Sequence, residues 1–414
     1  MSSPHPVTER RLVFLIGAVQ FVNILDFMMV MPLGPDLARA LGMPSSQLGL
    51  VGGAYTAAAA VSGLLGALFL DRFDRRSALA CALLGLVIAT ASGGLAVNLP
   101  TLLAARLAAG AFGGPATAIA FAIITDAVPV ERRGRAMGAV MGAFSVASVL
   151  GIPAGLELAR IGGWQLPFFA VAGLGAVIAV LVVISLPPFT AHLVAAAGAP
   201  AEQTRSSALS FFTRPTFLLS FAATTCAMMS SYSLAPNLSA YLQFNLGYPR
   251  DRLFLLYLTG GAVSFVTMRF AGALADRYGP APIATIGGGA FVGTLYLMLL
   301  HPIAALPLVP VFAGFMICNT FRMIPMQALT SRVPAHSESA RFMSTQSAVQ
   351  HMSSALGATI SAQLLTVDAR GALVGIERVA WFAILLSLLL PVLLFMLQAR
   401  LKVRQAVTPL AQPA

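Results

Sequence analysis

Long apolar runs follow one another along almost the whole chain, and short polar segments separate them. Twelve of these runs reach about 20 residues, the length that an α-helix needs to cross the hydrocarbon core of a bilayer. Inside a bilayer, the backbone N–H and C=O groups must find hydrogen-bond partners within the protein, which only helices and closed β-barrels provide. The strands of a barrel are much shorter than these runs, so each run is predicted to be a helix. The predicted helices are residues 12–32, 47–69, 77–97, 99–124, 135–157, 164–186, 215–237, 251–275, 281–301, 304–328, 341–366 and 376–398.

A polar motif occurs at two equivalent places in this series. Residues 71–73 read Asp-Arg-Phe after the second predicted helix, and residues 276–278 read Asp-Arg-Tyr after the eighth, an offset of 205. We therefore predict two similar six-helix halves, residues 1–186 and 214–414. The segment 187–213 starts with two prolines and continues in a polar Ala/Gly/Ser stretch, which is typical of a linker. In a membrane protein, two such halves indicate a secondary transporter with its site between them.

Composition supports the membrane assignment. Hydrophobic residues make up 58% of the chain and charged residues 9%, whereas soluble domains carry roughly 25% charged residues. The net charge of +11 would also suit a nucleic-acid partner. Sorting of basic residues to one membrane face explains it better, because most Lys and Arg become cytoplasmic when the amino terminus is placed inside. The sequence predicts a multi-pass protein of the cell (inner) membrane with both termini cytoplasmic and no nucleic-acid partner.

The sequence contains no pattern typical of an enzyme or a cofactor site. Cys81, Cys226 and Cys318 lie far apart inside apolar runs, without the spacing of a disulfide or a metal site, and are predicted to be inert buried thiols. The five histidines are scattered, and no glycine-rich stretch is followed by the Lys-Ser/Thr of a phosphate loop. We expect no enzyme activity, no metal and no cofactor.

Asp26 is the most informative single residue, because it lies inside the first predicted helix. A carboxylate within a spanning helix is unfavourable and is usually kept for function. Burial disfavours the charged form, so such a group can take up a proton near neutral pH. We predict that Asp26 handles protons; the alternative is a structural carboxylate locked to a cation or to backbone donors.

Arg106 lies in the fourth predicted helix at a matching depth. Asp26 is 14 residues into its helix, roughly 21 Å from the cytoplasmic edge and roughly 9 Å from the outer edge of a 30 Å core. Arg106 is seven residues into a helix of opposite direction, roughly 10 Å from that same outer edge. A nearby Arg would keep the carboxylate switchable between its two protonation states. The alternative is a static ion pair.

The halves, the linker and the Asp-Arg-x-x-Arg-Arg sequence between the second and third helices together resemble the major facilitator superfamily over essentially the whole chain. The motif departs from the family pattern because Ala67 and Asp74 replace two glycines. Residues 25–27 (Leu-Asp-Phe), Arg106 with Gly110, and residues 151–155 (Gly-Ile-Pro-Ala-Gly) resemble the drug:proton antiporter branch, the last one only in part. The resemblance implies that the first and fourth helices lie side by side, so that Asp26 and Arg106 meet.

The resemblance also implies a cytoplasmic gate that latches the halves together when the cavity opens outward. In this gate Asp71 would meet Arg135, and Asp126 would join one of the arginines of the motif. Asp276 and Arg277 would repeat the arrangement in the second half. The alternative is a set of solvated ion pairs, which contribute little. The predicted gate residues are Asp71, Arg72, Arg75, Arg76, Asp126, Arg135, Asp276 and Arg277.

Polar side chains within the apolar runs are candidates for the substrate cavity. Those of the eleventh helix recur at steps of three or four, so they form one face that either lines a wet cavity or packs on another helix. Pro236-Asn237 predicts a break in the seventh helix. Arg322 has no evident acidic partner in the sequence. The alternatives for its role are to bind an anionic substrate group, to repel a proton-loaded state, or to form hydrogen bonds with helix carbonyls. The predicted cavity residues are Gln20, Asn23, Tyr232, Asn237, Arg322, Gln346 and Gln350.

Together these features predict an all-α membrane protein of twelve helices that works by alternating access. We expect a monomer to be functional and a proton gradient to drive transport. The preferred function is export of a small organic compound, drug-like or metabolite, by proton antiport. Proton symport and facilitated uniport are the alternatives, and a non-transporting receptor on the same scaffold is a more remote one. The expected partners are the substrate, protons and the lipid bilayer.

Overall fold

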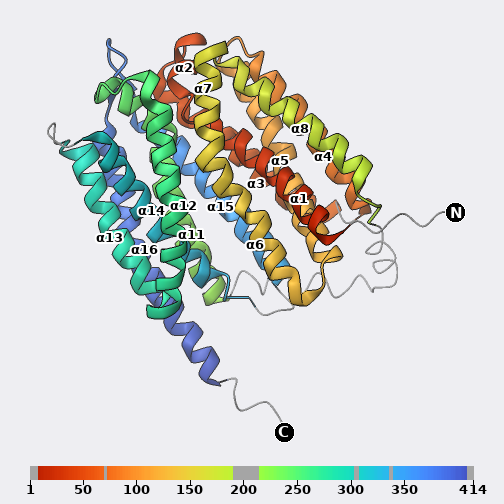
Figure 1. The fold of residues 1–414 in the computed structure, drawn as a ribbon. Coiled ribbons are helices and arrows are strands. Elements are labelled where there is room, and N and C mark those ends of the chain that lie inside the picture. The colour runs from red at the N-terminus through yellow and green to blue at the C-terminus, as the bar shows by residue number, and fades with distance from the viewer. Residues whose placement is uncertain (1–7, 70–71, 190–213, 303–306, 335–338, 408–414) are drawn as a thin grey trace, which may run out of the picture.

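The computed structural model describes residues 8–69, 72–189, 214–302, 307–334 and 339–407, and nearly all of them form one bundle of long helices (Figure 1). The first half of the chain contributes α1 (Glu9–Met29), α2 (Gly34–Ala40), η1 (Ser45–Gln47), α3 (Leu48–Phe69), α4 (Arg75–Gly94), α5 (Leu99–Ala127), α6 (Val130–Val146), the π-helical η3 (Ala147–Gly151), α7 (Ile152–Gly162) and α8 (Gln165–Ser185).

The second half contributes a further series of long helices and one short hairpin. Its elements are α11 (Pro215–Ala240), the π-helical η4 (Tyr241–Asn245), η5 (Arg250–Arg252), α12 (Leu253–Tyr278), α13 (Pro280–Leu295), the π-helical η6 (Tyr296–Leu300), α14 (Leu308–Thr330), α15 (Ser339–Leu364), β1 (Thr366–Val367), β2 (Leu373–Val374) and α16 (Ile376–Val407). The two strands pair antiparallel, with Thr366 opposite Val374.

The twelve predicted helices are all found. Within the described residues, eleven helical segments are long and apolar enough to cross a membrane. The twelfth long helix is α15, which falls outside this set because Ser, Thr, Gln and His residues interrupt its apolar positions. The fifth predicted helix is longer than expected and runs through α6, η3 and α7. The protein is thus a multi-pass, all-α membrane protein, as predicted.

Three local features differ from the sequence-based expectations. The predicted break at Pro236-Asn237 is wrong, because α11 continues through Pro236 to Ala240 and passes directly into η4. Residues 34–40 form the short helix α2, which was not expected. The hairpin of β1 and β2 was not expected either. The segment 190–213, most of the predicted linker, lies outside the described residues.

Capping residues explain where several helices begin and end. Asn98 and Thr101 form a reciprocal capping box at the start of α5. Asp74 caps α4 by accepting from the backbone N–H of Ser77 at 3.0 Å. Gly163 and Gly279 follow α7 and α12 with φ of 79° and 95°, a conformation that favours glycine. The start of α4 therefore depends on a residue that replaces a glycine of the family motif.

Asp74 also holds the end of the first half against α4. One carboxylate oxygen accepts from the N–H of Phe189 at 2.6 Å, and the other accepts from the Ser77 hydroxyl at 2.8 Å. Partial burial acts to raise the pKa of Asp74, but hydrogen bonds from Ser77, Phe189 and Arg76 outweigh it and lower the pKa. Aspartate at this position thus does more than support a turn.

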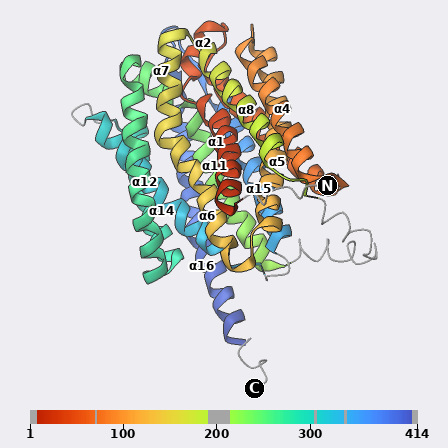
Figure 2. The same cartoon turned by 45° about the vertical axis from the view of Figure 1, so that its right-hand side comes forward.

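The helices pack as two groups that meet along α3, α7, α12 and α15. In the first group α5 packs against α3 and α4, and α4 packs against α8; in the second, α11 packs against α15 and α16, and α13 against α14 and α16. Figures 1 and 2 show the warm-coloured and the blue-green helices side by side. Between the groups, α3 packs against α15, and α7 with η3 packs against α12. The binding site of a two-half transporter is expected at this junction.

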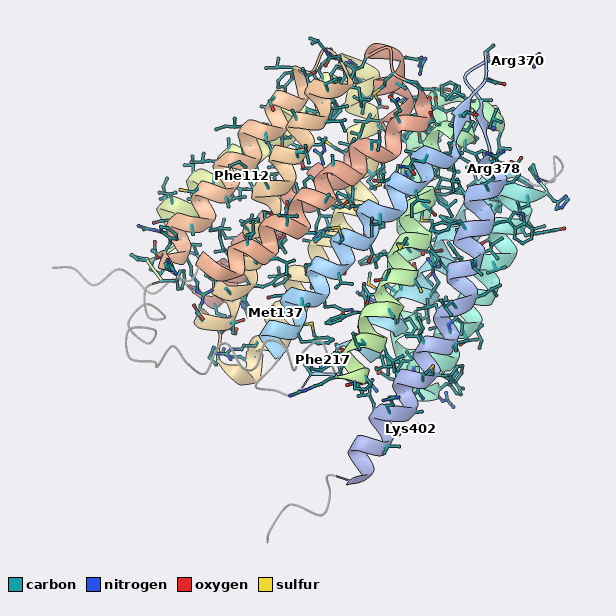
Figure 3. All side chains as sticks on the ribbon, turned by 180° about the vertical axis from the view of Figure 1, so that it is seen from behind. Phe112, Met137, Phe217, Arg370, Arg378 and Lys402 are labelled. Atoms are coloured by element: carbon teal, nitrogen blue, oxygen red, sulfur yellow. The ribbon has the colours of Figure 1, made fainter. Side chains whose placement is uncertain are left out.

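The bundle has two ends, which we name by the chain segments found there. The distal end carries α2, the 246–252 turn and the 365–375 hairpin, whereas the proximal end carries the start of α1 and the end of α16. Figure 3 shows Arg370 and Arg378 near one end and Lys402 on the extension of α16 at the other. Large apolar side chains are exposed on the outer helices, among them Ile88, Ile184 and Leu385. Such a surface suits contact with lipid chains.

Candidate functional site

Asp26 and Arg106 form a fully buried ion pair, as predicted. The Arg106 Nη1 donates to both carboxylate oxygens of Asp26, at 3.1 and 3.0 Å, and Nη2 donates to the Asp26 carbonyl at 3.3 Å. The two side chains are 1% and 0% exposed. The pair joins α1 to α5, and the hydroxyl of Thr90 on α4 donates to the same carboxylate at 2.8 Å. Three helices of the first half thus converge on one carboxylate.

A second layer of polar residues surrounds this ion pair. The Arg106 guanidinium lies 4.7 Å from the centre of the Tyr55 ring, a cation–π contact. The Tyr55 hydroxyl donates to Asn23 at 2.7 Å, and Asn23 donates to Thr117 at 2.6 Å. Thr117 in turn donates to Gln20 at 3.2 Å. The predicted cavity residues Gln20 and Asn23 are therefore buried members of a hydrogen-bonded network between α1, α3 and α5.

Close backbone approach makes this network compact. An added Cβ at Gly110 of α5 would overlap the Tyr55 carbonyl oxygen, so only glycine lets α5 reach α3 at this level. The backbone carbonyl of Gly113 also joins the network, because it accepts from Asn23 at 3.0 Å. The Arg-x-x-x-Gly sequence of α5 thus combines the charged partner of Asp26 with the glycine that brings Tyr55 close.

An aromatic contact connects this site to the second half. The Phe27 ring lies 5.2 Å from the Tyr55 ring and 5.8 Å from the Tyr232 ring of α11. Phe27 and Tyr232 are each half-buried. The residue next to Asp26 therefore touches the opposite half of the molecule, at the predicted cavity residue Tyr232.

Arg322 lies in the second half on α14 and is 0% exposed. Its Nη1 donates to Ser230 at 3.0 Å and to Ser387 at 2.7 Å. Its Nη2 donates to Ser231 at 2.6 Å and to Asn319 at 3.1 Å. The guanidinium also lies 4.0 Å from the centre of the Phe291 ring. These neutral contacts exclude helix carbonyls as its main partners in this conformation.

The polar face of α15 packs mainly on α11. Gln346 bonds to Thr224, and Ser361 accepts from Asn237 at 2.7 Å. The backbone of Gly357 approaches Met229 so closely that an added Cβ would lie 2.6 Å from its carbonyl oxygen. Of the predicted cavity residues here, Gln346 and Asn237 thus bond between helices, while Gln350 is half-buried and its carbonyl accepts from Ser354.

Three of the predicted gate residues of the first half, Arg75, Arg76 and Asp126, make contacts within that half. Arg75 pairs with Asp126 at 2.6 Å, as expected for one arginine of the motif. Arg76 donates to the Leu186 carbonyl at 3.2 Å. Arg72 and Arg135 are exposed. Asp71 lies outside the described residues, so its predicted contact with Arg135 remains a prediction.

The second-half copy of the motif is similar but more exposed. Asp276 pairs with Arg332 at 3.2 Å, and its side chain is 74% exposed. Arg277 lies over the ring of Tyr278 at 5.2 Å. All ion pairs seen at the proximal end within the described residues join residues of one half. A role in latching the halves stays a prediction about another conformation.

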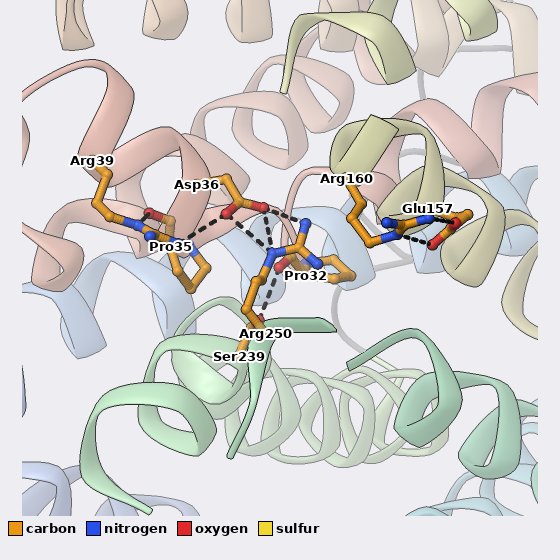
Figure 4. A network of polar contacts seen from close by, with 8 residues as sticks. All are labelled: Pro32, Pro35, Asp36, Arg39, Glu157, Arg160, Ser239 and Arg250. Carbon is orange, nitrogen blue, oxygen red and sulfur yellow. Dashed lines mark hydrogen bonds and ion pairs between the residues drawn. The ribbon is translucent and has the colours of Figure 1, made fainter. Parts of the chain in front are cut away.

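The distal end contains contacts between the halves that the sequence did not reveal (Figure 4). Asp36 of α2 accepts from Arg250 Nε at 2.8 Å and from its Nη2 at 2.5 Å, a two-pronged ion pair across 214 positions. Nearby, the buried Ser239 hydroxyl donates to the Pro32 carbonyl at 2.8 Å. We call these two contacts the distal clasp. Neither residue pair forms a sequence motif, so only the folded chain identifies them.

Close helix packing extends the distal closure into the bundle. An added Cβ at Gly49 of α3 would overlap the Ala358 carbonyl oxygen of α15, and one at Gly53 would lie 3.3 Å from the Ala355 carbonyl oxygen. In the middle of the bundle, a Cβ at Gly261 of α12 would lie 2.8 Å from the Ser148 carbonyl oxygen. Glycines thus allow the halves to approach closely from the distal end to the middle of the molecule.

The described residues contain no group of three or more His, Cys, Asp or Glu side chains able to hold a metal ion. What they do contain is a buried ion pair in one half, a buried arginine with neutral partners in the other, and an aromatic contact between them.

Comparison with known proteins agrees with this architecture. The family model described as Major Facilitator Superfamily matches residues 16–358. A chloramphenicol resistance protein of Streptomyces lividans is 29% identical over 302 residues, which cover 72% of this chain and 75% of the relative.

Solved structures are similar over nearly the whole fold. A bacterial homologue of the human lysosomal transporter Spinster, in an inward-facing and occupied conformation, has a TM-score of 0.72 at 16% identity and covers 98% of both chains. The D-xylose–proton symporter has a TM-score of 0.73 at 14% identity, covering 92% of this chain and 96% of its own. With the two helical groups, the Asp-Arg motifs and the family match together, the chain belongs to the Major Facilitator Superfamily and is a membrane transporter of small solutes rather than an enzyme.

Proposed function

We propose that this transporter exports a small organic compound in exchange for protons, and that Asp26 is the group that binds the proton. The observation that carries the proposal is the fully buried carboxylate of Asp26 in a membrane-spanning helix, held by Arg106 and Thr90. Such groups usually belong to ion or substrate pathways. The resistance protein similar to this chain supports export as the direction of transport.

Protonation of Asp26 would change the contacts that hold α1 to α5. The carboxylate now accepts from Arg106 through both of its oxygens. A proton on either oxygen cancels the negative charge and weakens this attraction. Phe27 follows Asp26 directly and touches Tyr232. A shift of α1 at the ion pair would therefore move a side chain that contacts the other half. We propose this contact as the link between protonation and movement.

Coupling requires that proton and substrate each bind the two conformations unequally. In the present conformation the distal clasp joins the halves, and we assign the distal end to the outside of the cell and the proximal end, with both termini, to the cytoplasm. A proton arriving from outside would then reach Asp26 after the clasp has opened. Protonation of Asp26 would favour the conformation that is closed at the distal end. In that conformation Asp26 would release the proton to the cytoplasm. A single chain contains both halves, so we expect a monomer to suffice.

Liposomes containing the purified protein and an internal pH dye test this proposal. We would add chloramphenicol first and then lipophilic cations, sugars, amino acids and organic anions. A compound-dependent pH change is expected in the unaltered protein and not in Asp26→Asn. Glu157→Gln is the matched control, because it removes a carboxylate that pairs with Arg160 of the same helix.

The sign of the pH change, at known protein orientation, separates the functions that the sequence left open. Opposite movement of compound and proton is expected for export by antiport. Movement in the same direction would mean symport, and saturable flux without a pH change in both proteins would mean uniport. Retained proton-driven accumulation in Asp26→Asn would overturn the role of Asp26.

A further inference from the structure

The second half of the molecule contains a buried positive charge that no acidic residue in the described part of the chain balances. Arg322 is 0% exposed, and its four hydrogen-bond partners are three hydroxyls and one amide oxygen. Among the described residues no carboxylate forms an ion pair with it, and the described acidic residues of this half, Asp251, Asp276, Asp368 and Glu377, lie at helix ends or turns. Arg322 is thus a buried cation with neutral surroundings.

Neutral acceptors satisfy hydrogen bonds but do not cancel the charge. A buried charge without an opposite charge is unfavourable unless it is paired. The Nε of Arg322 is buried and has no hydrogen-bond partner at all. A guanidinium presents Nε and Nη2 on one edge, where a carboxylate binds with both oxygens. One position of that edge is therefore free, and Nη2 is shared by Ser231 and Asn319.

The internal repeat indicates what is missing. The offset of 205 places Ser231 opposite Asp26 and Tyr232 opposite Phe27. In the first half, the arginine on the fourth spanning helix meets a carboxylate on the first; in the second half, the arginine on the equivalent helix meets the Ser231 hydroxyl instead. The two arginines are not at equivalent positions, because the same offset places Arg106 opposite Val311. Each nevertheless reaches the aligned position on the first helix of its half, and the two sites differ there by one negative charge.

The contacts also indicate the side from which a ligand would arrive. Ser230 and Ser387 are fully buried behind the guanidinium, whereas Ser231 and Asn319 are half-buried. The neighbouring Tyr232 touches Phe27 of the other half. Ser231 and Asn319 thus mark the less buried side of Arg322, and the contact of the adjacent Tyr232 with Phe27 favours an approach to this side from the junction of the halves. Displacement of Asn319 from Nη2 would open the Nε–Nη2 edge to a ligand from there.

We propose that Arg322, with Ser231 and Asn319, binds an acidic group of the transported compound, a carboxylate or a similar monoanion. The inference rests on the proposed transport function, and it specifies the chemical class of the substrate. The ligand supplies the counter-charge that Asp26 supplies in the first half. Binding is electrostatic and bidentate, so an amide of the same shape binds much more weakly than the acid.

Binding by purified protein in detergent tests the inference without any measurement of transport. We would follow thermal unfolding with sodium salts of monocarboxylates from acetate to benzoate and naphthoate, with chloride, and with the matching neutral amides. The unaltered protein should be stabilised by at least one carboxylate at a concentration at least tenfold lower than by its amide.

Two variants separate binding at Arg322 from a general salt effect. Arg322→Met removes the charge at similar volume, and Ser231→Asp places a carboxylate of the protein itself beside the guanidinium. We expect both to lose the difference between acid and amide, and Ser231→Asp also to unfold at a higher temperature in the absence of ligand. Arg269→Gln is the control, because it removes an exposed arginine of α12 and should respond like the unaltered protein.

Several outcomes would overturn the inference. The site is wrong if no carboxylate is preferred over its amide, if the preference persists in Arg322→Met, or if Ser231→Asp leaves the anion response unchanged. Failure of the proton experiment above with an intact carboxylate preference would refute proton antiport alone. A pH change with neutral compounds and no carboxylate preference would refute the anion site alone.

Discussion

The two halves of this transporter each bury one arginine, and they treat its charge in opposite ways. Arg106 faces the Asp26 carboxylate, 3.0 Å away, and the pair is closed to solvent. Arg322 is equally buried but bonds to Ser230, Ser231, Ser387 and Asn319. One repeated scaffold therefore holds an arginine with its carboxylate in one half and an arginine with neutral partners in the other. We propose that the first acts as a switch by protonation and that the second binds a ligand that brings negative charge.

The largest effect is expected when the complete pair is broken. Arg106→Met leaves Asp26 buried with Thr90 as its remaining side-chain donor. Removing one partner of a buried ion pair lowers the free energy of unfolding by about 3–5 kcal/mol. Unfolding in detergent at neutral pH measures this loss. A loss below about 1 kcal/mol would show that the pair is not closed as described.

The same substitution should do little in the second half. Arg322→Met removes an uncompensated charge, and the hydroxyls it leaves already bond to one another: Ser230 to Ser387 at 2.9 Å and Ser231 to Asn319 at 3.3 Å. Because a buried charge without a counter-charge is itself unfavourable, its removal offsets the loss of the hydrogen bonds, and we expect a change within about 1 kcal/mol. A loss as large as that of Arg106→Met would remove the contrast between the halves.

The distal clasp tests whether the halves separate at that end. Asp36 and Arg250 are 18% and 23% exposed, so their ion pair is partly shielded from solvent. We expect Arg250→Gln to raise the population open at the distal end about five- to tenfold, equivalent to about 1–1.4 kcal/mol. Distances between spin labels across the distal end would measure this shift.

The control for the clasp is Arg39→Gln. Arg39 also contacts Asp36, at 3.1 Å, but on the same helix and with a side chain that is 61% exposed. Its loss should leave the conformational populations unchanged. Equal effects of Arg39→Gln and Arg250→Gln would mean that the contact across the halves does not hold the distal end closed.

A small and local effect is expected at Asp74, which lies outside the junction of the halves. Asp74→Ala removes the cap of α4 and should lower the free energy of unfolding by about 1 kcal/mol, whereas Asp74→Asn should retain most of it. Because hydrogen bonds lower the pKa of Asp74, its ionised form favours the folded state above its ordinary pKa of 3.8. This contribution disappears as the pH falls through the lowered value.

Unfolding at pH 7 and at acid pH measures the Asp74 contribution. The difference in stability between the unaltered protein and Asp74→Asn should shrink in acid, since the carboxylate is then protonated. A difference that grows as the pH falls would contradict the direction assigned to this pKa. Neither variant should alter the carboxylate preference at Arg322.

Much of the fold could be predicted because the bilayer restricts the choices. A segment such as residues 99–124 has one way to satisfy its backbone inside a membrane, and its apolar length reveals its position. The contact of Asp26 with Arg106 was also predictable, since intramembrane charges rarely remain unpaired and their depths matched. The contact of Asp126 with one arginine of the motif was expected from the family resemblance, which places opposite charges next to each other at this end of the bundle.

The remaining contacts depend on how helices rotate and pack, which periodicity does not determine. The polar face of α15 was compatible with a cavity or with packing, and the structure packs Gln346 against Thr224 of α11. A proline predicts a break only where the freed carbonyl finds no other partner, and α11 passes through Pro236 intact.

The sequence by itself determined the membrane environment, the number of helices, the two-half architecture and the intramembrane charges, because each follows from local hydropathy or from an internal repeat. Only the tertiary structure decided which neighbours those charges have. Arg322 had no partner in the sequence, and folding surrounds it with hydroxyls from two helices, α11 and α16. The distal clasp joins residues 214 positions apart. Such contacts arise from three-dimensional packing, in which side chains far apart along the chain become neighbours without any local pattern that announces them.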